Sequence, residues 1–200
     1  PAPWQVVRPP RSKLSRVRQT RHLKLLAHKL FPDADWTIYY DGQLQLAVDP
    51  VALLSECEAW GPAELYLFRH QDRECLYAEA TEVVRIGKDQ RANVTPVIER
   101  FRRQGVPERA GLYLGGMLIR RRWSCDAFNA RWWSHVAAGS HRDQISLPVA
   151  LAESGVQFTA LPAMWWGHFF LRHKHTMAAR PSLTGRGTPA RGFAPQSSRR

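Results

Sequence analysis

The sequence predicts an α/β fold, a β-sheet flanked by helices, and three observations support this. Three short apolar segments, at residues 36–40, 64–69 and 112–120, are rich in aromatic and β-branched residues, which is typical of strands. Amphipathic segments with helical spacing lie between them, and Gly and Pro residues mark the breaks. Strands that alternate with helices along a chain indicate an α/β sheet.

The elements expected before the second strand each have end signals in the sequence. A short strand at 4–7 is closed by Pro9-Pro10, and a basic helix over 13–30 ends at Phe31-Pro32. The strand at 36–40 stops at Asp41-Gly42, and an alternating apolar segment follows it over 44–48. Asp49-Pro50 then begins a short helix over 51–59, which Gly61-Pro62 ends.

The elements expected after the second strand are mostly helical. A helix over 75–86 ends at Gly87, and the next helix has Thr95 as its cap, Pro96 at its first position and Gly105 past its end. The strand at 112–120 is interrupted by Gly115-Gly116. A helix over 126–138 carries a buried stripe of Phe128, Trp132 and Val136, and the next helix opens at Ser140, with Asp143 completing a capping box.

Composition places the chain among ordinary soluble domains. Its 200 residues are 44% hydrophobic and 10% aromatic, which is enough for one domain with a sizeable core. The formal net charge is +12, but residues 1–31 and 172–200 hold fifteen Lys and Arg and no acid. The middle of the chain has a balance of −3, which argues against a nucleic-acid partner. We expect a domain at 1–175 and a disordered basic tail at 176–200.

Neither a membrane span nor a secretory leader is expected. No apolar run approaches the length of about 18 residues that a span needs, and the N-terminus lacks the apolar core of a signal peptide. Cys57, Cys75 and Cys125 are far apart and lack zinc-type spacing, so we expect reduced thiols and a cytoplasmic location, with peripheral membrane contact as an alternative. The chain opens Pro-Ala-Pro-Trp without Met, so we expect a fragment or a processed product.

Asp41-Gly42 is the most informative pair in the sequence. It delivers a carboxylate to the C-terminal edge of a strand, where ligands bind in open α/β sheets, and a hard oxygen there suits a divalent cation that carries a phosphate. The alternative is a simple hairpin turn, since Asp-Gly is a strong hairpin signal, and this segment alone favours the hairpin.

Other polar groups form a second set of candidates, each with a structural alternative. After the strand at 64–69, Arg73 is suited to gripping a phosphate and His70 to contacting a sugar hydroxyl, unless the loop is merely solvated. Asp143 and Gln144 lie in the first turn of a predicted helix. Pro148 has no amide hydrogen to donate to the Gln144 carbonyl, so this turn is either a polar acceptor site or a simple helix cap.

Cations and imidazoles near the two ends complete the candidates. Arg18, Arg21 and Lys24 fall on the basic helix, where they would neutralise a diphosphate or form a solvated face. His173 and His175 would give an imidazole to a metal or belong to a His-rich tail.

Taken in order, these motifs resemble one family. The matching segments are Arg18 through Asp41-Gly42, Asp49-Pro50, His70 through Ala80, Gly105 through Leu112, Trp132-Trp133 and Ser140 through Ser146. Over residues 5–175 the chain is similar to a glycosyltransferase-like domain, once of unknown function, that occurs in bacteria and in plant turgor-regulation and mucilage-related proteins.

The resemblance implies a GT-A-like, Rossmann-like mixed sheet that begins after the usual first strand–helix unit. It also implies transfer of a sugar from a nucleotide-sugar donor to a glycan or other hydroxyl acceptor, assisted by Mn²⁺ or Mg²⁺. Asp41 and a late imidazole, His173 or His175, would hold the metal. Arg18, Lys24, Gly42, His70 and Arg73 would meet the donor, and Asp143 and Gln144 would face the anomeric carbon.

Two other functions stay open on the sequence. One is a binding module whose basic ends hold nucleic acid or an acidic membrane surface, with an affinity that falls steeply with salt. The other is an inactive transferase-like scaffold.

Overall fold

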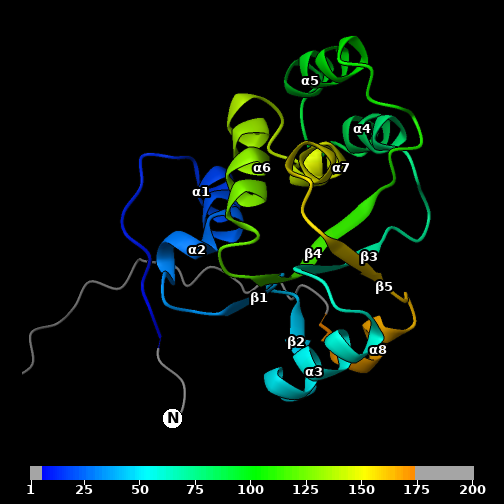
Figure 1. The fold of residues 1–200 in the computed structure, drawn as a ribbon. Helices are drawn as coiled ribbons and strands as arrows, with labels where there is room; N and C mark the ends of the chain where they lie inside the picture. The colour runs from blue at the N-terminus through cyan, green and yellow to red at the C-terminus, as the bar shows by residue number, and fades with distance from the viewer. Residues whose placement is uncertain (1–5, 174–200) are drawn as a thin grey trace, which may run out of the picture.

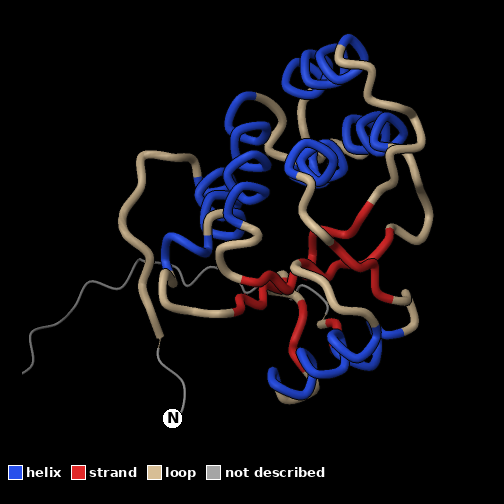
Figure 2. Tube along the Cα trace, viewed as in Figure 1, coloured by secondary structure: helices blue, strands red, loops and turns tan. Residues whose placement is uncertain are grey.

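The computed structural model describes residues 6–173 (Figure 1). A mixed four-stranded sheet lies in the middle, with α1, α6 and α7 on one side and β2, α3 and α8 on the other. Figure 2 shows the strands between these two groups of helices. The arrangement confirms the predicted α/β class, a mixed sheet flanked by helices.

The main sheet has the order β1-β4-β3-β5, in which only the β3–β5 pair is parallel. Its strands are β1 (Trp36–Tyr40), β3 (Leu65–Arg69), β4 (Tyr113–Arg121) and β5 (Phe158–Leu161). A second sheet pairs β2 (Leu44–Leu46) with β6 (Phe170–Arg172). The strands predicted at 36–40, 64–69 and 112–120 are therefore present, within one residue of their predicted ends.

The helices are α1 (Arg16–Leu25), α2 (Ala27–Leu30), α3 (Pro50–Trp60), α4 (Leu76–Arg85), α5 (Arg91–Arg103), α6 (Asp126–Ala138), α7 (Asp143–Ser154) and α8 (Trp165–Phe169). Between residues 6 and 173, none of them is long and apolar enough to cross a membrane. Gly105, with φ of 73°, follows the end of α5 as predicted.

The hairpin interpretation of Asp41-Gly42 is wrong. β1 pairs with β4, where Tyr40 lies opposite Met117, whereas β2 pairs with β6, where Leu44 lies opposite Arg172. The turn is tight, since the Leu44 amide donates to the Asp41 carbonyl at 2.8 Å. The two strands separate because each finds a distant partner that buries its apolar face, so Asp41 stands where the chain passes from one sheet to the other.

The basic helix predicted over 13–30 is divided at Leu26. Ser15 caps its start by accepting a hydrogen bond from the Arg18 amide. At its end, Arg120 donates to the carbonyl oxygens of Lys24 at 2.9 Å and Leu25 at 3.4 Å, which gives these terminal groups a partner outside the helix. The strand expected at 4–7 is absent at Val6 and Val7, and its other two residues lie outside the described range.

Two predicted helix starts are also wrong. α5 begins at Arg91, so Pro96 lies inside the helix. The earlier start buries Val94 on the same face as Ile98, and this burial outweighs the hydrogen bond that Pro96, which has no amide hydrogen, cannot donate. α7 begins at Asp143, because the Ser140 hydroxyl donates to Asp89 at 2.6 Å and caps no helix.

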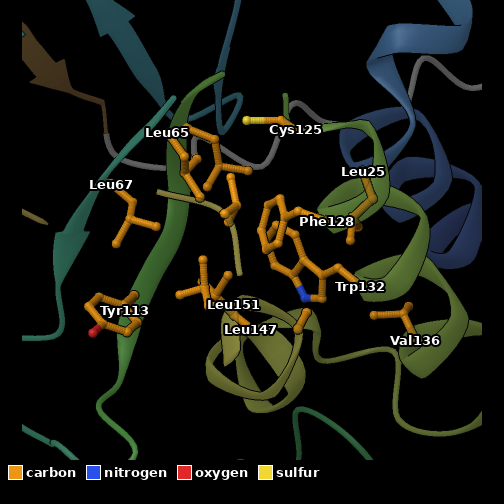
Figure 3. Close-up of a cluster of buried hydrophobic side chains, with 13 residues drawn as sticks. Leu25, Leu65, Leu67, Tyr113, Cys125, Phe128, Trp132, Val136, Leu147 and Leu151 are labelled. Carbon is orange, nitrogen blue, oxygen red and sulfur yellow. The ribbon is translucent and has the colours of Figure 1, made fainter. Parts of the chain in front are cut away.

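The largest buried cluster lies between the sheet and α1, α6 and α7 (Figure 3). The predicted stripe of Phe128, Trp132 and Val136 is fully buried in it. The Trp132 indole donates to the Asp143 carbonyl at 2.8 Å, which fixes the start of α7 against α6. Since truncating a buried Trp costs about 3–5 kcal/mol, this cluster holds the first turn of α7 firmly in place.

Candidate functional site

Two consecutive glycines in β4, Gly115 and Gly116, form the floor of the site. The pairing of β3 with β4 is irregular here, since Tyr66 lies opposite Ile119 but Phe68 lies opposite Leu114. A Cβ on Gly115 would lie 2.9 Å from Lys24 Nζ, and one on Gly116 would lie 3.2 Å from Asp41 Oδ2. Only glycine therefore allows these charged groups to approach the strand so closely.

A cleft with a volume of about 930 Å³ opens above this floor. Its walls come from the segments that follow β1 and β3, the connection between α4 and α5, the start of α7, and the α8–β6 region. The polar and charged residues that line it include Asp41, His70, Lys88, Arg142, Gln144 and Arg172. A more apolar hollow of about 610 Å³ lies between α1 and β1 and contains none of these six.

Asp41 presents one carboxylate oxygen to the cleft. Its Oδ1 accepts a hydrogen bond of 2.7 Å from the Tyr39 hydroxyl, while Oδ2 faces Gly116. Burial and the neighbouring Asp41 carboxylate raise the pKa of Tyr39, so the phenol stays protonated and keeps donating. The second oxygen is therefore the one that a cation or a donor would meet.

Asp143 and Lys24 form a buried ion pair beneath Gly115. Their exposed fractions are 4% and 3%, and Arg21 Nε lies 3.5 Å from the other oxygen of Asp143. Burial alone would raise the pKa of Asp143, but Lys24 and Arg21 outweigh it and hold the pKa below its usual value. Asp143 does not line the cleft, whereas the adjacent Gln144 does, with a buried side-chain Nε2 that has no partner among the described residues.

Arg18 lies away from the cleft, at the C-terminal end of α6. Its guanidinium donates to three backbone carbonyls, those of Val136 at 2.7 Å, Ala137 at 3.1 Å and Gly139 at 2.8 Å. This cation caps a helix C-terminus, a position that the helix dipole favours.

His70 and Arg73 are in contact, but only His70 lines the cleft. Arg73 Nε donates to Glu79 at 2.8 Å, and its terminal nitrogen lies 3.1 Å from His70 Nε2. Burial, and then the nearby Arg73 charge, lowers the pKa of His70, so its ring is neutral at neutral pH. The backbone amides of Asp72 and Arg73 donate to His70 Nδ1 at 3.1 and 3.2 Å and so hold the ring in place.

Among the described residues, the predicted metal ligands Asp41 and His173 do not meet in the cleft. The His173 side chain lies 2.8 Å from the Gln45 amide oxygen and outside the cleft lining, and His175 lies outside the described residues. Over residues 6–173, no group of three His, Cys, Asp or Glu is placed to hold a metal. Asp41 fits as one hard oxygen ligand at the floor, and Gly42 contributes only the open turn beside it.

Comparison with known proteins identifies the family of this chain. Residues 3–165 match the TOD1/MUCI70, glycosyltransferase-like domain. The chain belongs to this family. It is similar to the probable hexosyltransferase MUCI70 of Arabidopsis thaliana, at 27% identity over 132 residues, which are 62% of this chain and 23% of the plant protein. The chain therefore spans about a quarter of the length of that relative.

Membership of the TOD1/MUCI70 family confirms the resemblance seen in the sequence, and the mixed sheet agrees with a GT-A-like fold. Sequence reasoning missed three parts of the site. The paired glycines had a signal, since Gly-Gly inside a strand often marks a bulge or a close approach. Lys88 and Arg172 had none, because a single cation in a loop or at the end of a short strand looks like ordinary surface in a sequence.

Proposed function

We propose that this TOD1/MUCI70 domain transfers a sugar from a nucleotide-sugar donor to a hydroxyl acceptor in the glycine-floored cleft. A hexosyl group is the first candidate, because the plant relative is named a probable hexosyltransferase. The observation that carries the proposal is the convergence of Asp41 and the Lys24–Asp143 pair on Gly115-Gly116. Apolar side chains at these two positions would stabilise the sheet, whereas charged groups packed against glycine backbone do not. Such an arrangement indicates a role in function.

The donor end of the cleft is proposed to lie at Asp41. Its Oδ2 would hold a divalent cation, Mn²⁺ or Mg²⁺, while the Tyr39 hydroxyl fixes the other oxygen. When bound, such an ion supplies charge that neutralises a departing diphosphate. The indole of Trp166, 3.5 Å from where a Gly116 Cβ would stand, offers an apolar face beside this position for a sugar or a base.

The acceptor end is proposed to lie at the start of α7. The Gln144 side chain lines the cleft, and its buried Nε2 has no partner among the described residues, so a rotation of the amide would let it bind a hydroxyl and orient it for attack. Asp143 would act from below the floor, as the fixed counter-ion of Lys24. In this scheme Gln144 touches substrate, and Asp143 is a positioning residue.

A thermal-shift screen tests the proposal. The chain is heated with UDP-, GDP- and CMP-sugars, with and without Mn²⁺, and with the free sugars as controls. At least one nucleotide sugar should raise the Tm, more strongly with Mn²⁺, because a ligand that binds only the folded state stabilises it. A Tm that stays unchanged for every donor at millimolar concentration would contradict the proposal.

We also propose that the domain works in a reducing compartment such as the cytoplasm. Cys57, Cys75 and Cys125 are all free thiols in the structure. Burial, followed by nearby acidic residues, raises the pKa of Cys57, which keeps that thiol protonated and unreactive. A free-thiol titration of protein purified without reductant should give three thiols per chain, and fewer would contradict this location.

A further inference from the structure

The cations that the sequence offered for a diphosphate are already engaged by protein groups. Arg18 is bound to three carbonyls, Lys24 to Asp143 and Arg73 to Glu79. A guanidinium or ammonium that is buried against its own partner cannot also neutralise a ligand without breaking that contact. Another source of positive charge is therefore needed for a leaving group that carries two phosphates.

Two cations in the cleft wall are not engaged in this way. Lys88 and Arg142 both line the cleft, and neither forms an ion pair with a carboxylate in the described part of the chain. Arg142 Nε is buried and has no hydrogen-bond partner there. Arg172 also lines the cleft and, like Lys88, is exposed, but it lies on β6, opposite Leu44. Lys88 and Arg142 differ from it because their two segments are fastened together.

Asp89 makes this connection, which we call the Asp89 latch. Its Oδ2 accepts hydrogen bonds from the Ser140 hydroxyl at 2.6 Å and the His141 amide at 3.1 Å. The His141 ring closes the latch, with Nδ1 3.2 Å from Asp89 and Nε2 3.1 Å from the Lys88 carbonyl. Lys88 thus takes part in the contact between the two segments through its own carbonyl, and Arg142 directly follows His141.

The latch is buried and well satisfied. Asp89 is 7% exposed, and its other oxygen accepts from the Gln90 amide at 2.7 Å and the Asn93 side chain at 2.8 Å. Burial opposes ionisation, but the hydrogen bonds from Asn93, Ser140 and Gln90 outweigh it and lower the pKa of Asp89. The carboxylate therefore stays charged and rigidly bound at neutral pH.

We propose that Lys88 and Arg142 together bind the diphosphate of the donor, and that Asp89 is the positioning residue that keeps them on one wall of the cleft. This inference rests on the proposed glycosyl transfer. Arg142 supplies a planar guanidinium that matches phosphate oxygens, and Lys88 supplies a mobile point charge. Because the latch fixes the backbone segments that carry both cations, little backbone order has to be created when the donor binds.

Calorimetric titration tests the pair. UDP, GDP and inorganic pyrophosphate, each with Mn²⁺, are titrated into the wild-type chain, Lys88→Met, Arg142→Met and the control Arg91→Met. Arg91 is a nearby exposed cation that does not line the cleft. Each cleft variant should raise Kd about tenfold, the loss of one charge-assisted contact, while the control stays within about twofold of wild type.

A double-mutant cycle tests the latch. In an Asp89→Asn background, the further change Lys88→Met should raise Kd by less than about threefold, because Lys88 is no longer held in place. A purely structural Asp89 would lower the Tm but leave the tenfold effect of Lys88→Met intact, which would overturn its positioning role.

The outcomes also separate this inference from the function on which it rests. If the wild-type chain binds none of the three probes, both are overturned. If it binds them and Lys88→Met and Arg142→Met bind equally well, only the assignment of the diphosphate to this pair is overturned.

Discussion

The buried Lys24–Asp143 pair gives the sharpest stability prediction. In Asp143→Asn, the Lys24 ammonium stays only 3% exposed but loses the negative charge of its one bonded carboxylate among the described residues. The Tyr39 and Trp132 rings, whose centroids lie 5.1 and 5.5 Å from Nζ, cannot replace a carboxylate. Removing one partner of a buried pair costs about 3–5 kcal/mol, so the free energy of unfolding should fall by that amount.

Urea unfolding followed by Trp fluorescence measures this loss, and the Tm should fall by about 6–20 °C for a chain of this size. The double variant Lys24→Met/Asp143→Leu replaces both charges with apolar groups, and it should be more stable than Asp143→Asn. Arg85→Met is the control, because its ion pair with Glu82 is exposed, and it should unfold as the wild type does. If Asp143→Asn unfolded within about 1 kcal/mol of wild type, Asp143 would not be the buried counter-ion described here.

Three further predictions follow from the same contacts. The folded-state pKa of Asp143 is lowered, so its stabilising contribution is complete above about pH 4 and is lost as the pH falls through the folded value; urea midpoints should drop as the pH falls below about 4, and by less in Lys24→Met/Asp143→Leu. Gly116→Ala places a methyl 3.2 Å from Asp41 Oδ2, so binding of UDP with Mn²⁺ should weaken while the Tm changes little; Gly61→Ala, with its nearest atom at 3.8 Å, is the calorimetric control. Arg18→Met removes three contacts to the end of α6 and should lower the free energy of unfolding by about 2 kcal/mol without changing Kd for UDP; a changed Kd at unchanged stability would contradict its capping role.

The elements that could be predicted are those whose local pattern agrees with their burial. The 64–69 strand and the Phe128, Trp132 and Val136 stripe were found because their apolar residues match the surface that they bury. Local signals failed where a distant contact prevailed. The Asp41-Gly42 hairpin does not form because β1 pairs with β4 and β2 pairs with β6. Thr95 does not cap a helix because α5 starts earlier and buries Val94.

The residues of the site likewise divide into those that the local sequence predicted and those that depend on distant contacts. Asp41, His70 and Gln144 were found because each follows a strand or opens a helix, and all three line the cleft. Arg18 was misleading, because nothing in its local sequence shows that its partners are carbonyls 118 to 121 residues away. Lys88 and Arg142 were missed as a pair for the same reason, since the Asp89 latch joins segments that lie about fifty residues apart.

The central claim, that the Asp41 carboxylate in the cleft binds a metal-borne nucleotide sugar, is tested most directly by calorimetry. UDP-sugar and GDP-sugar donors are titrated, with and without Mn²⁺, into the wild-type chain and Asp41→Asn, with the Tm of each measured as a check on folding. We predict Mn²⁺-dependent binding by the wild type and none by an equally stable Asp41→Asn. Equal binding by the two proteins would contradict it.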